Sequence, residues 1–271
     1  MSSKNFIIKN VENISYNPIK EKMKLKTDIK WLDTLLPEGI AVPSSTLISG
    51  PGGTGKPLIE FAYVSAWLKA GGSLIGIPLQ YPTVDLIYTA MNKLYNIDLK
   101  DYLGKIAYIQ FDPHADKLEK IGDDTLKANM VKPDMWDEAI EMAENMVEKS
   151  DLGTMVFGSA LNLLLFSRTY KDSILKKLKE VIRTDKSKTY AFAVSTSAFA
   201  DKIKVLEEAA DNLMFTRIEK PMRLFFRISR MKGVEFSSEE IEVPIPKEML
   251  EEISKVAEAI RKKRIPEIMD I

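Results

Sequence analysis

The residues with the clearest chemical potential form the stretch Ser49-Gly50-Pro51-Gly52-Gly53-Thr54-Gly55-Lys56-Pro57, which follows the apolar run 45–48. Its spacing fits G-x-x-x-x-G-K, the pattern of a phosphate-binding P-loop between a strand and a helix. Glycines let such a loop bend until its backbone N–H groups point at a phosphate. The residues expected to bind phosphate are Gly50, Gly52, Gly53, Thr54, Gly55 and Lys56.

One position departs from the pattern. The residue after the lysine is normally Ser or Thr, whose hydroxyl holds Mg²⁺, and here it is Pro57. Proline is accepted in the first turn of a helix, but it has neither a hydroxyl nor a backbone N–H. The stretch therefore predicts phosphate binding, while the loss of the hydroxyl makes Mg²⁺ binding doubtful. It leaves open whether the ligand is ATP, ADP or a simple anion.

Composition excludes several other classes of function. The chain has 271 residues, 45% of them apolar, which suits one globular domain. Its 39 basic and 39 acidic residues balance, so global charge gives no attraction to nucleic acid or anionic membrane. With no cysteine and only His114, we expect no metal site and no thiol chemistry. No signal peptide or membrane span is expected, so we predict a cytoplasmic protein, and the charge-rich composition is typical of a thermophile.

The elements that would position the loop alternate between short apolar strands and amphipathic helices. This alternation predicts an α/β fold with a mostly parallel sheet covered on both faces. Residues 112–134 are polar and are expected to form a surface excursion. Strands are expected at 6–8, 45–48, 74–77, 106–111, 155–157, 190–194 and 213–215, a closing antiparallel pair at 224–228 and 241–243, and helices at 29–36, 58–70, 82–95, 134–149 and 247–264.

Three segments follow from these elements. Residues 1–26 are expected to be an N-terminal arm, 27–246 the P-loop domain, and 247–271 a C-terminal amphipathic helix with a tail. The tail after residue 264 is apolar enough to pack on its own chain or on a partner, and the sequence does not decide between the two.

Four short motifs in order carry a resemblance to a known family. Lys26-Thr27-Asp28-Ile29 and Pro37-Glu38-Gly39-Ile40 precede the loop, and Ala210-Asp211-Asn212-Leu213 and Arg230-Met231-Lys232-Gly233 follow it. With the loop, they resemble the KaiC/RadA branch of the RecA-like ATPases over about residues 25–245. The resemblance implies a RecA-like P-loop fold of archaeal type, ATP binding and ring-shaped homo-oligomers. It also implies that Arg230 and Lys232 reach the phosphates of a neighbouring subunit, unless they merely decorate a solvated hairpin.

The same resemblance identifies catalytic positions that this chain has changed. In the family an Asp at the end of the fourth strand holds the metal, and the matching residue is Gly158. The family's catalytic Glu follows the second strand, where this chain has Leu79 and Gln80. Together with Pro57, these changes predict that ATP hydrolysis is lost or strongly reduced. Gln80 could still position a water molecule, as Gln does in some GTPases, or it could be an ordinary polar residue at a strand end.

The leading hypothesis is a regulatory or scaffolding protein with a protein or peptide partner. One alternative is an active ATPase with an atypical metal site. Another is an accessory protein that binds single-stranded DNA, which the apolar segment 160–166 disfavours because such sites combine cationic and stacking residues. Ser195-Thr196-Ser197 lies where the family senses the γ-phosphate, although strand-end hydroxyls also commonly bond to local backbone.

Overall fold

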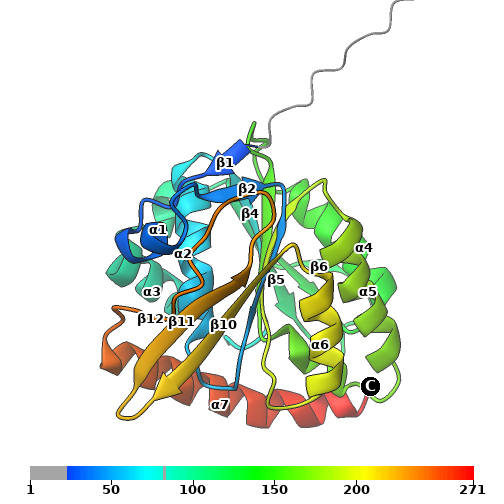
Figure 1. The fold of residues 1–271 in the computed structure, drawn as a ribbon. Coiled ribbons are helices and arrows are strands. Elements are labelled where there is room, and N and C mark those ends of the chain that lie inside the picture. Colours follow the sequence, from blue (N-terminus) through cyan, green and yellow to red (C-terminus); the bar gives the residue numbers. More distant parts are fainter. Residues whose placement is uncertain (1–22, 82–83) are drawn as a thin grey trace, which may run out of the picture.

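A ten-stranded sheet organises the structure, a computed structural model that describes residues 23–81 and 84–271 (Figure 1). The seven strands from β10 to β7 run parallel. In spatial order the strands are β12 (Ile241–Glu242), β11 (Arg223–Arg230), β10 (Asn212–Glu219), β3 (Ser45–Ser49), β9 (Thr189–Ala193), β8 (Thr154–Ser159), β4 (Ser73–Pro78), β5 (Ile106–Phe111), β7 (Thr125–Ala128) and β6 (Glu119–Lys120). The strand expected at 6–8 lies outside the described residues.

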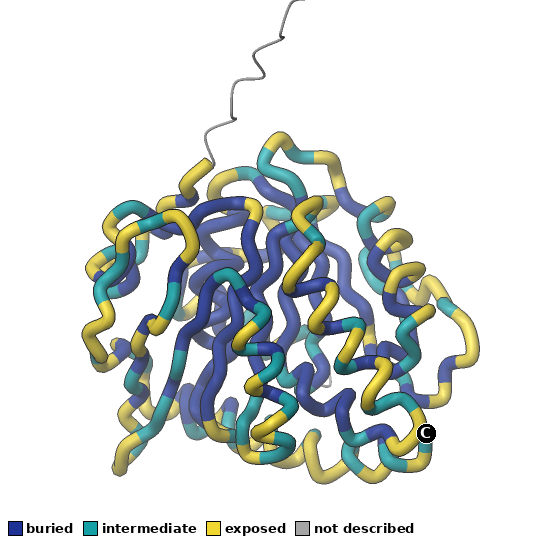
Figure 2. Tube along the Cα trace, turned by 45° about the vertical axis from the view of Figure 1, so that its right-hand side comes forward, coloured by how far each residue is buried: buried dark blue, intermediate teal, exposed yellow. Residues whose placement is uncertain are grey.

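Helices cover both faces of this sheet, as the alternation of elements predicted. The α1 helix (Lys30–Leu35), α2 (Lys56–Lys69) and α3 (Asp85–Tyr95) pack into one buried apolar cluster. The α4 helix (Pro133–Glu144), α5 (Lys171–Thr184) and α6 (Ala200–Ala209) pack into a second cluster on the opposite face. Figure 2 shows the central strands buried between these layers. Strands buried on both faces must be apolar throughout, which is why they read as short continuous apolar runs.

Beyond β10 the sheet continues in antiparallel pairing. Strand β10 extends past the segment expected at 213–215 and forms a long hairpin with β11, in which Glu219 pairs with Arg223. The expected pairing of segments 224–228 and 241–243 is confirmed by β11 and β12, which pair through Phe225 with Glu242 and Phe226 with Ile241. A separate two-stranded sheet is formed by β1 (Met23–Leu25) and β2 (Ile40–Val42).

Residues 112–134 differ from their expected role as a surface excursion. Strand β7 inside this segment pairs in parallel with β5, and β6 pairs with β7, so the segment extends the sheet. Leu126, Met130 and Val131 are fully buried. The polar residues of this segment belong to its turns. They outnumber the apolar residues of the strand, and for that reason the sequence pattern did not indicate a strand. Helices α5 and α6 were likewise not among the expected elements, although both pack on the sheet.

The C-terminal helix α7 (Lys247–Met269) lies along the edge of the sheet at which the parallel strands end. It continues five residues beyond the predicted end at 264, through Pro266. It contacts the 3₁₀ helix η2 (Leu161–Phe166), which follows β8. The carbonyl of Ile271 accepts hydrogen bonds from Thr169 N, at 3.1 Å, and from Ser167 Oγ, at 2.9 Å. The tail therefore packs on its own chain.

A second short 3₁₀ helix, η1 (Leu99–Tyr102), follows α3.

Candidate phosphate site

The P-loop connects β3 to α2 at the carboxyl edge of the sheet, as its position in the sequence predicted. Two of its glycines are required by geometry. Gly50 has φ +149°, and a Cβ there would lie 2.4 Å from the carbonyl oxygen of Thr216. Gly55 has φ +61°, a left-handed conformation, and a Cβ there would lie 2.7 Å from Leu250 Cδ2. The loop is thus folded tightly between β10 and α7.

The loop leaves part of its backbone available to an anion. Gly52 N–H donates to Ser197 Oγ at 2.8 Å. The N–H groups of Gly53, Thr54 and Gly55 have no acceptor among residues 23–81 and 84–271. Consecutive free N–H groups at the start of a helix form a concave site for an anion, which the helix dipole favours further.

The side chain of Lys56 is folded into the loop itself. Its Nζ donates to Gly50 O at 3.0 Å, to Pro51 O at 2.5 Å and to Thr54 Oγ1 at 3.1 Å. An ammonium group has three N–H donors, so these oxygens use all of them. Lys56 is 6% exposed, and burial lowers its pKa to about 7. To contact a phosphate, Lys56 would have to exchange at least one of these bonds.

The segment after β9 is held against the loop. Thr196 N–H donates to Gly50 O at 3.0 Å, and Ser195 N–H donates to Asn162 Oδ1 at 2.8 Å. Ser197 N–H donates to Ser195 Oγ at 3.3 Å, while the Ser197 hydroxyl accepts from the loop. These serines therefore contact the loop, and in this arrangement their hydrogen bonds are to Gly52 of the loop, to the Asn162 side chain and to one another.

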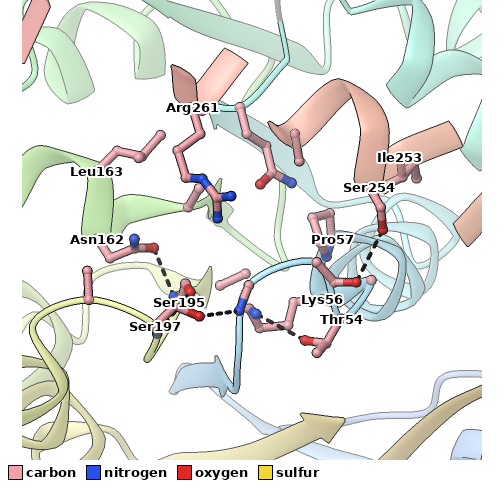
Figure 3. A pocket seen from close by; sticks show the side chains of 18 of the residues that line it. Thr54, Lys56, Pro57, Asn162, Leu163, Ser195, Ser197, Ile253, Ser254 and Arg261 are labelled. Carbon is pink, nitrogen blue, oxygen red and sulfur yellow. Dashed lines mark hydrogen bonds between the residues drawn. The ribbon is translucent and has the colours of Figure 1, made fainter. Parts of the chain in front are cut away.

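Helix α7 covers the loop and closes a cavity of about 80 Å³. Ser254 Oγ donates to Gly53 O at 3.2 Å, which ties the helix to the loop directly. Figure 3 shows the guanidinium of Arg261 pointing from α7 into this cavity, toward the loop and Ser195. The apolar part of the wall comes from η2 and α7 and includes Leu163, Phe166, Ile253 and Ala257. Sequence reasoning assigned α7 to a C-terminal appendage and did not place Arg261 in the site.

The three positions expected to carry catalysis are not suited to Mg²⁺ or to activating water. Pro57 stands in the first turn of α2 and lines the cavity. Leu79 is 3% exposed, and its neighbour Gln80 lines the cavity while its amide donates to Tyr81 Oη at 3.1 Å. No carboxylate of the described residues lines the cavity, and those residues contain no cluster of metal-ligating side chains. The residues present therefore do not fit the Mg²⁺ ion that the resemblance implied.

A buried carboxyl group, which sequence reasoning missed, lies behind the site. Glu60 is fully buried on α2, where Oε1 accepts from Gly158 N at 2.9 Å and Oε2 accepts from the Ser159 hydroxyl. Burial raises the pKa of Glu60 to about 8, although both hydrogen bonds act in the opposite direction. The signal in the sequence was a single acidic residue in the middle of an apolar helical run. Both oxygens are engaged and neither faces the cavity, so Glu60 does not supply a metal ligand there.

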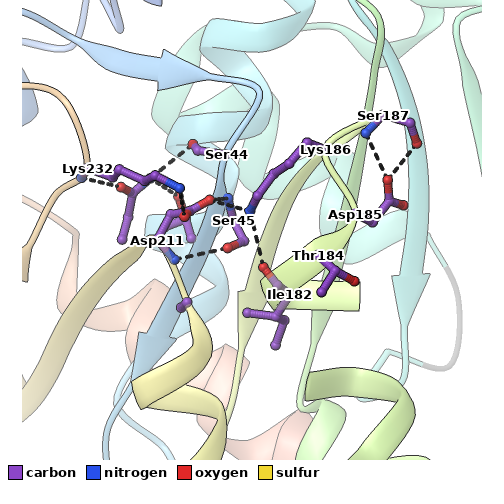
Figure 4. A network of polar contacts seen from close by, with 12 residues as sticks. Ser44, Ser45, Ile182, Thr184, Asp185, Lys186, Ser187, Asp211 and Lys232 are labelled. Carbon is purple, nitrogen blue, oxygen red and sulfur yellow. Dashed lines mark hydrogen bonds and ion pairs between the residues drawn. The ribbon is translucent and has the colours of Figure 1, made fainter. Parts of the chain in front are cut away.

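Lys232 lies at the opposite edge of the sheet, where β3 and β10 begin (Figure 4). Arg230 lies there too, because it pairs with Leu213 at the start of β10. Lys232 Nζ pairs with Asp211 Oδ1 at 2.6 Å, and Lys186 pairs with the other oxygen at 2.6 Å. Burial acts to raise the pKa of Asp211, but the hydrogen bonds from the two lysines hold it below its ordinary value. Arg230 donates to the carbonyls of Glu207 and Ala210. Contact with a neighbouring subunit's phosphates stays a prediction for both residues, and for Lys232 it would compete with Asp211.

No helix in the described ranges is long and apolar enough to cross a membrane. His114 is exposed, and its backbone N–H donates to Asp112 Oδ1 at 2.9 Å.

The fold recurs in solved structures of two archaeal proteins. One is the KaiC-like protein PH0186 from Pyrococcus horikoshii OT3, with a TM-score of 0.60 and 14% sequence identity over 83% of this chain and 96% of the other. The second is the flagellar accessory protein FlaH from Methanocaldococcus jannaschii, with a TM-score of 0.61 and 17% identity over the same shares. No protein-family model and no curated protein matches the sequence. The similarity of architecture confirms the expectation that the motifs raised: the chain has a KaiC/RadA-like RecA fold with a P-loop.

Proposed function

We propose that this protein binds a phosphoryl group at its P-loop, as inorganic phosphate or within ADP or ATP, and that its ATP hydrolysis is lost or strongly reduced. The observation that carries the proposal is that this site keeps the groups that bind phosphate but lacks the hydroxyl that would bind the metal ion. The loop keeps open N–H groups at Gly53, Thr54 and Gly55, whereas Pro57 stands where a hydroxyl would hold the metal.

The surroundings of the loop support the loss of hydrolysis. Phosphoryl transfer requires a metal ion between the β- and γ-phosphates and a group that aligns the attacking water. At the end of β8, Gly158 contributes only its backbone N–H, which donates to Glu60. Leu79 is buried and apolar. Binding can therefore rest on the loop's amides and nearby cations, while the chemical step has no suitable groups.

We further propose a regulatory or scaffolding role in the cytoplasm, with a protein or peptide as partner. Occupancy of the loop can be transmitted because α7 contacts both the loop and solvent. Ser254 bonds to Gly53, whereas Lys255, Glu258 and Lys262 on the same helix are exposed. A partner that recognises this exposed side would sense the state of the loop. The partner could also be a second copy of this chain, since the resemblance implies a homo-oligomer.

The test of phosphate binding uses a matched pair of variants at Gly53. This residue has φ +76°, and a Cβ there would meet only Ser254 Oγ, at 3.9 Å. Asn and Asp both tolerate the left-handed conformation, so Gly53→Asp and Gly53→Asn differ mainly in one negative charge. Calorimetric titrations with inorganic phosphate and with ADP should show binding that Gly53→Asp abolishes and Gly53→Asn largely keeps.

Lys56→Met serves as an independent second variant, since it keeps the buried stem and removes the charge. We expect it to weaken binding while the thermal unfolding profile stays cooperative. If wild-type protein binds neither phosphate nor ADP, or binds them equally well in Gly53→Asp and in Gly53→Asn, the proposed function is wrong.

One observation favours a second candidate, an ATPase with an atypical site. Gln80 lines the cavity, where it could align a water molecule. This candidate predicts phosphate release from ATP that Gln80→Ala abolishes while nucleotide binding is retained. A Gln80→Ala variant indistinguishable from wild type in release would exclude a role for this side chain.

A further inference from the structure

The side chain of Arg261 faces the P-loop from α7 across the cavity. We propose that Arg261 completes the phosphate site, so that with α7 in place the cavity takes a single phosphate-sized oxyanion in preference to a nucleoside phosphate. This inference rests on the proposed phosphate binding at the loop, and it adds to that proposal the binding residue and the size of the ligand.

Unlike Lys262 and Arg264, Arg261 has no acidic partner within ion-pair distance among the described residues. Lys262 pairs with Glu258 at 2.8 Å, and Arg264 pairs with Glu267 at 3.2 Å. The Arg261 side chain makes no hydrogen bond or ion pair with any residue in the ranges 23–81 and 84–271, and its charge acts on Glu258 only through a longer-range interaction. Its Nη1 instead lies 3.0 Å from the place of a Cβ on Gly52, at the mouth of the loop. Figure 3 shows this guanidinium directed inward, between α7 and the loop.

The loop's own lysine adds positive charge to the site but has no free donor for a direct contact with an anion. All three donors of Lys56 are used by the oxygens of Gly50, Pro51 and Thr54, as described above. Arg261 has five N–H donors in a planar fork, a geometry that matches two oxygens of a phosphate. An anion between this fork and the N–H groups of Gly53, Thr54 and Gly55 would accept hydrogen bonds from the guanidinium on one side of the cavity and from the loop on the other.

The size of the cavity limits what can bind there. Pockets for organic ligands usually measure about 300–1,000 Å³. The cavity under α7 measures about 80 Å³. That is the room of about two to three water molecules, which suits one tetrahedral oxyanion. Ile253 and Ala257 form the α7 side of the wall and limit the room beside a bound phosphate.

Binding of the anion should also strengthen the attachment of α7. The helix is now held to the loop by the Ser254–Gly53 hydrogen bond and by Leu250, which packs over Gly55. A phosphate bridging the loop to Arg261 adds a charge-assisted contact that exists only when the helix is docked. A ligand that binds only the docked state shifts the helix toward that state.

The test compares Arg261→Gln with Lys263→Gln in the full-length protein. Both remove one positive charge from an exposed position on α7, and Lys263 has no described partner and does not line the cavity. Calorimetric titration with inorganic phosphate at constant ionic strength should give an affinity at least about tenfold weaker in Arg261→Gln than in Lys263→Gln. In wild-type protein the affinity for phosphate should exceed that for ADP.

Hydrogen exchange of α7 provides a second readout that a general charge effect would not change. Phosphate should slow exchange of the α7 amides in wild type and in Lys263→Gln, but not in Arg261→Gln. Equal phosphate affinity in the two variants, or ADP binding tighter than phosphate, would overturn this inference while leaving the proposed function intact. Failure of wild-type protein to bind either ligand in a manner sensitive to Gly53→Asp would instead refute the proposed function and, with it, the inference.

Discussion

Glu60 of α2 accepts a hydrogen bond from the backbone N–H of Gly158 at 2.9 Å. This contact joins the helix after the P-loop to the end of β8, the position at which the resemblance drawn from the sequence implies a metal-binding carboxylate. In this chain the carboxyl group reaches the strand end from the helix and is fully buried. The Glu60 carboxyl group thus connects α2 to the end of β8, whereas a metal ligand at this position would have to be ionised and open to the site.

The buried carboxyl group predicts a distinctive dependence of stability on pH. Burial raises the pKa of Glu60 from 4.5 to about 8 in the folded protein. A raised pKa means that the stabilisation is fully present below pH 4.5 and is lost as the pH rises through about 8. The variant Glu60→Gln keeps an acceptor for Gly158 and cannot ionise. Its free energy of unfolding, relative to wild type, should rise by about 2–4 kcal/mol between pH 5 and pH 9.

Urea unfolding at several pH values measures this difference, and Lys56 must be controlled for. Burial lowers the pKa of Lys56 to about 7, so its contribution to stability rises between about pH 7 and pH 10.5, opposite in sign to that of Glu60. Taking wild type and variant at each pH cancels the Lys56 contribution. Parallel curves for wild type and Glu60→Gln would show that Glu60 is ionised in the folded protein.

Restoring a carboxylate at the strand end should destabilise the protein. A Cβ on Gly158 would lie 3.1 Å from Leu161 Cδ2 and 3.4 Å from Phe192 Cδ1, and the new carboxylate would also lie near Glu60. We therefore expect Gly158→Asp to lower the free energy of unfolding by about 2–4 kcal/mol. At a pH above about 8, where Glu60 itself ionises, adding Glu60→Gln should recover part of that loss, by about 1 kcal/mol or more, because the two carboxylates then no longer repel each other.

A double-mutant cycle in urea measures that coupling between Gly158→Asp and Glu60→Gln. Strictly additive effects would show that Asp at 158 does not sense Glu60, and the contact would then be purely steric.

The two left-handed glycines of the loop predict different costs for the same substitution. A methyl group at position 53 would meet only Ser254 Oγ, at an ordinary contact distance of 3.9 Å, so Gly53→Ala should cost about 1 kcal/mol from backbone conformation alone. Gly55→Ala would in addition place a methyl group 2.7 Å from Leu250 Cδ2 and should cost at least about 1 kcal/mol more. Thermal unfolding of both variants, and of Gly55→Ala combined with Leu250→Ala, checks this difference. Equal costs at the two positions would mean that α7 does not pack on Gly55.

The sequence predicted the strand–loop–helix unit at 45–69 well because three independent signals coincide there: an apolar run, glycines at fixed spacing, and an apolar helix. Strand β7 was missed because a four-residue strand inside polar turns gives almost no periodic signal. The role of Arg261 was missed for another reason. It depends on where α7 docks, and docking is decided by contacts between residues about 200 positions apart, such as Gly53 and Ser254, which no local pattern records.

The P-loop motif also showed the limit of a pattern read in isolation. It placed Lys56 at the phosphates, whereas the folded chain engages all three of its donors within the loop. Whether a lysine faces outward depends on which carbonyl oxygens surround it, and glycine spacing alone does not specify them.

The measurement that tests the central claim most directly is release of inorganic phosphate from ATP in the presence of Mg²⁺. We predict no release by wild-type protein above that of Lys56→Met, under conditions in which Gly53→Asp-sensitive binding of phosphate or ADP is detected. Turnover by the wild type that Lys56→Met abolishes would contradict the claim, and would mean that the chain retains a metal site and a water-activating group.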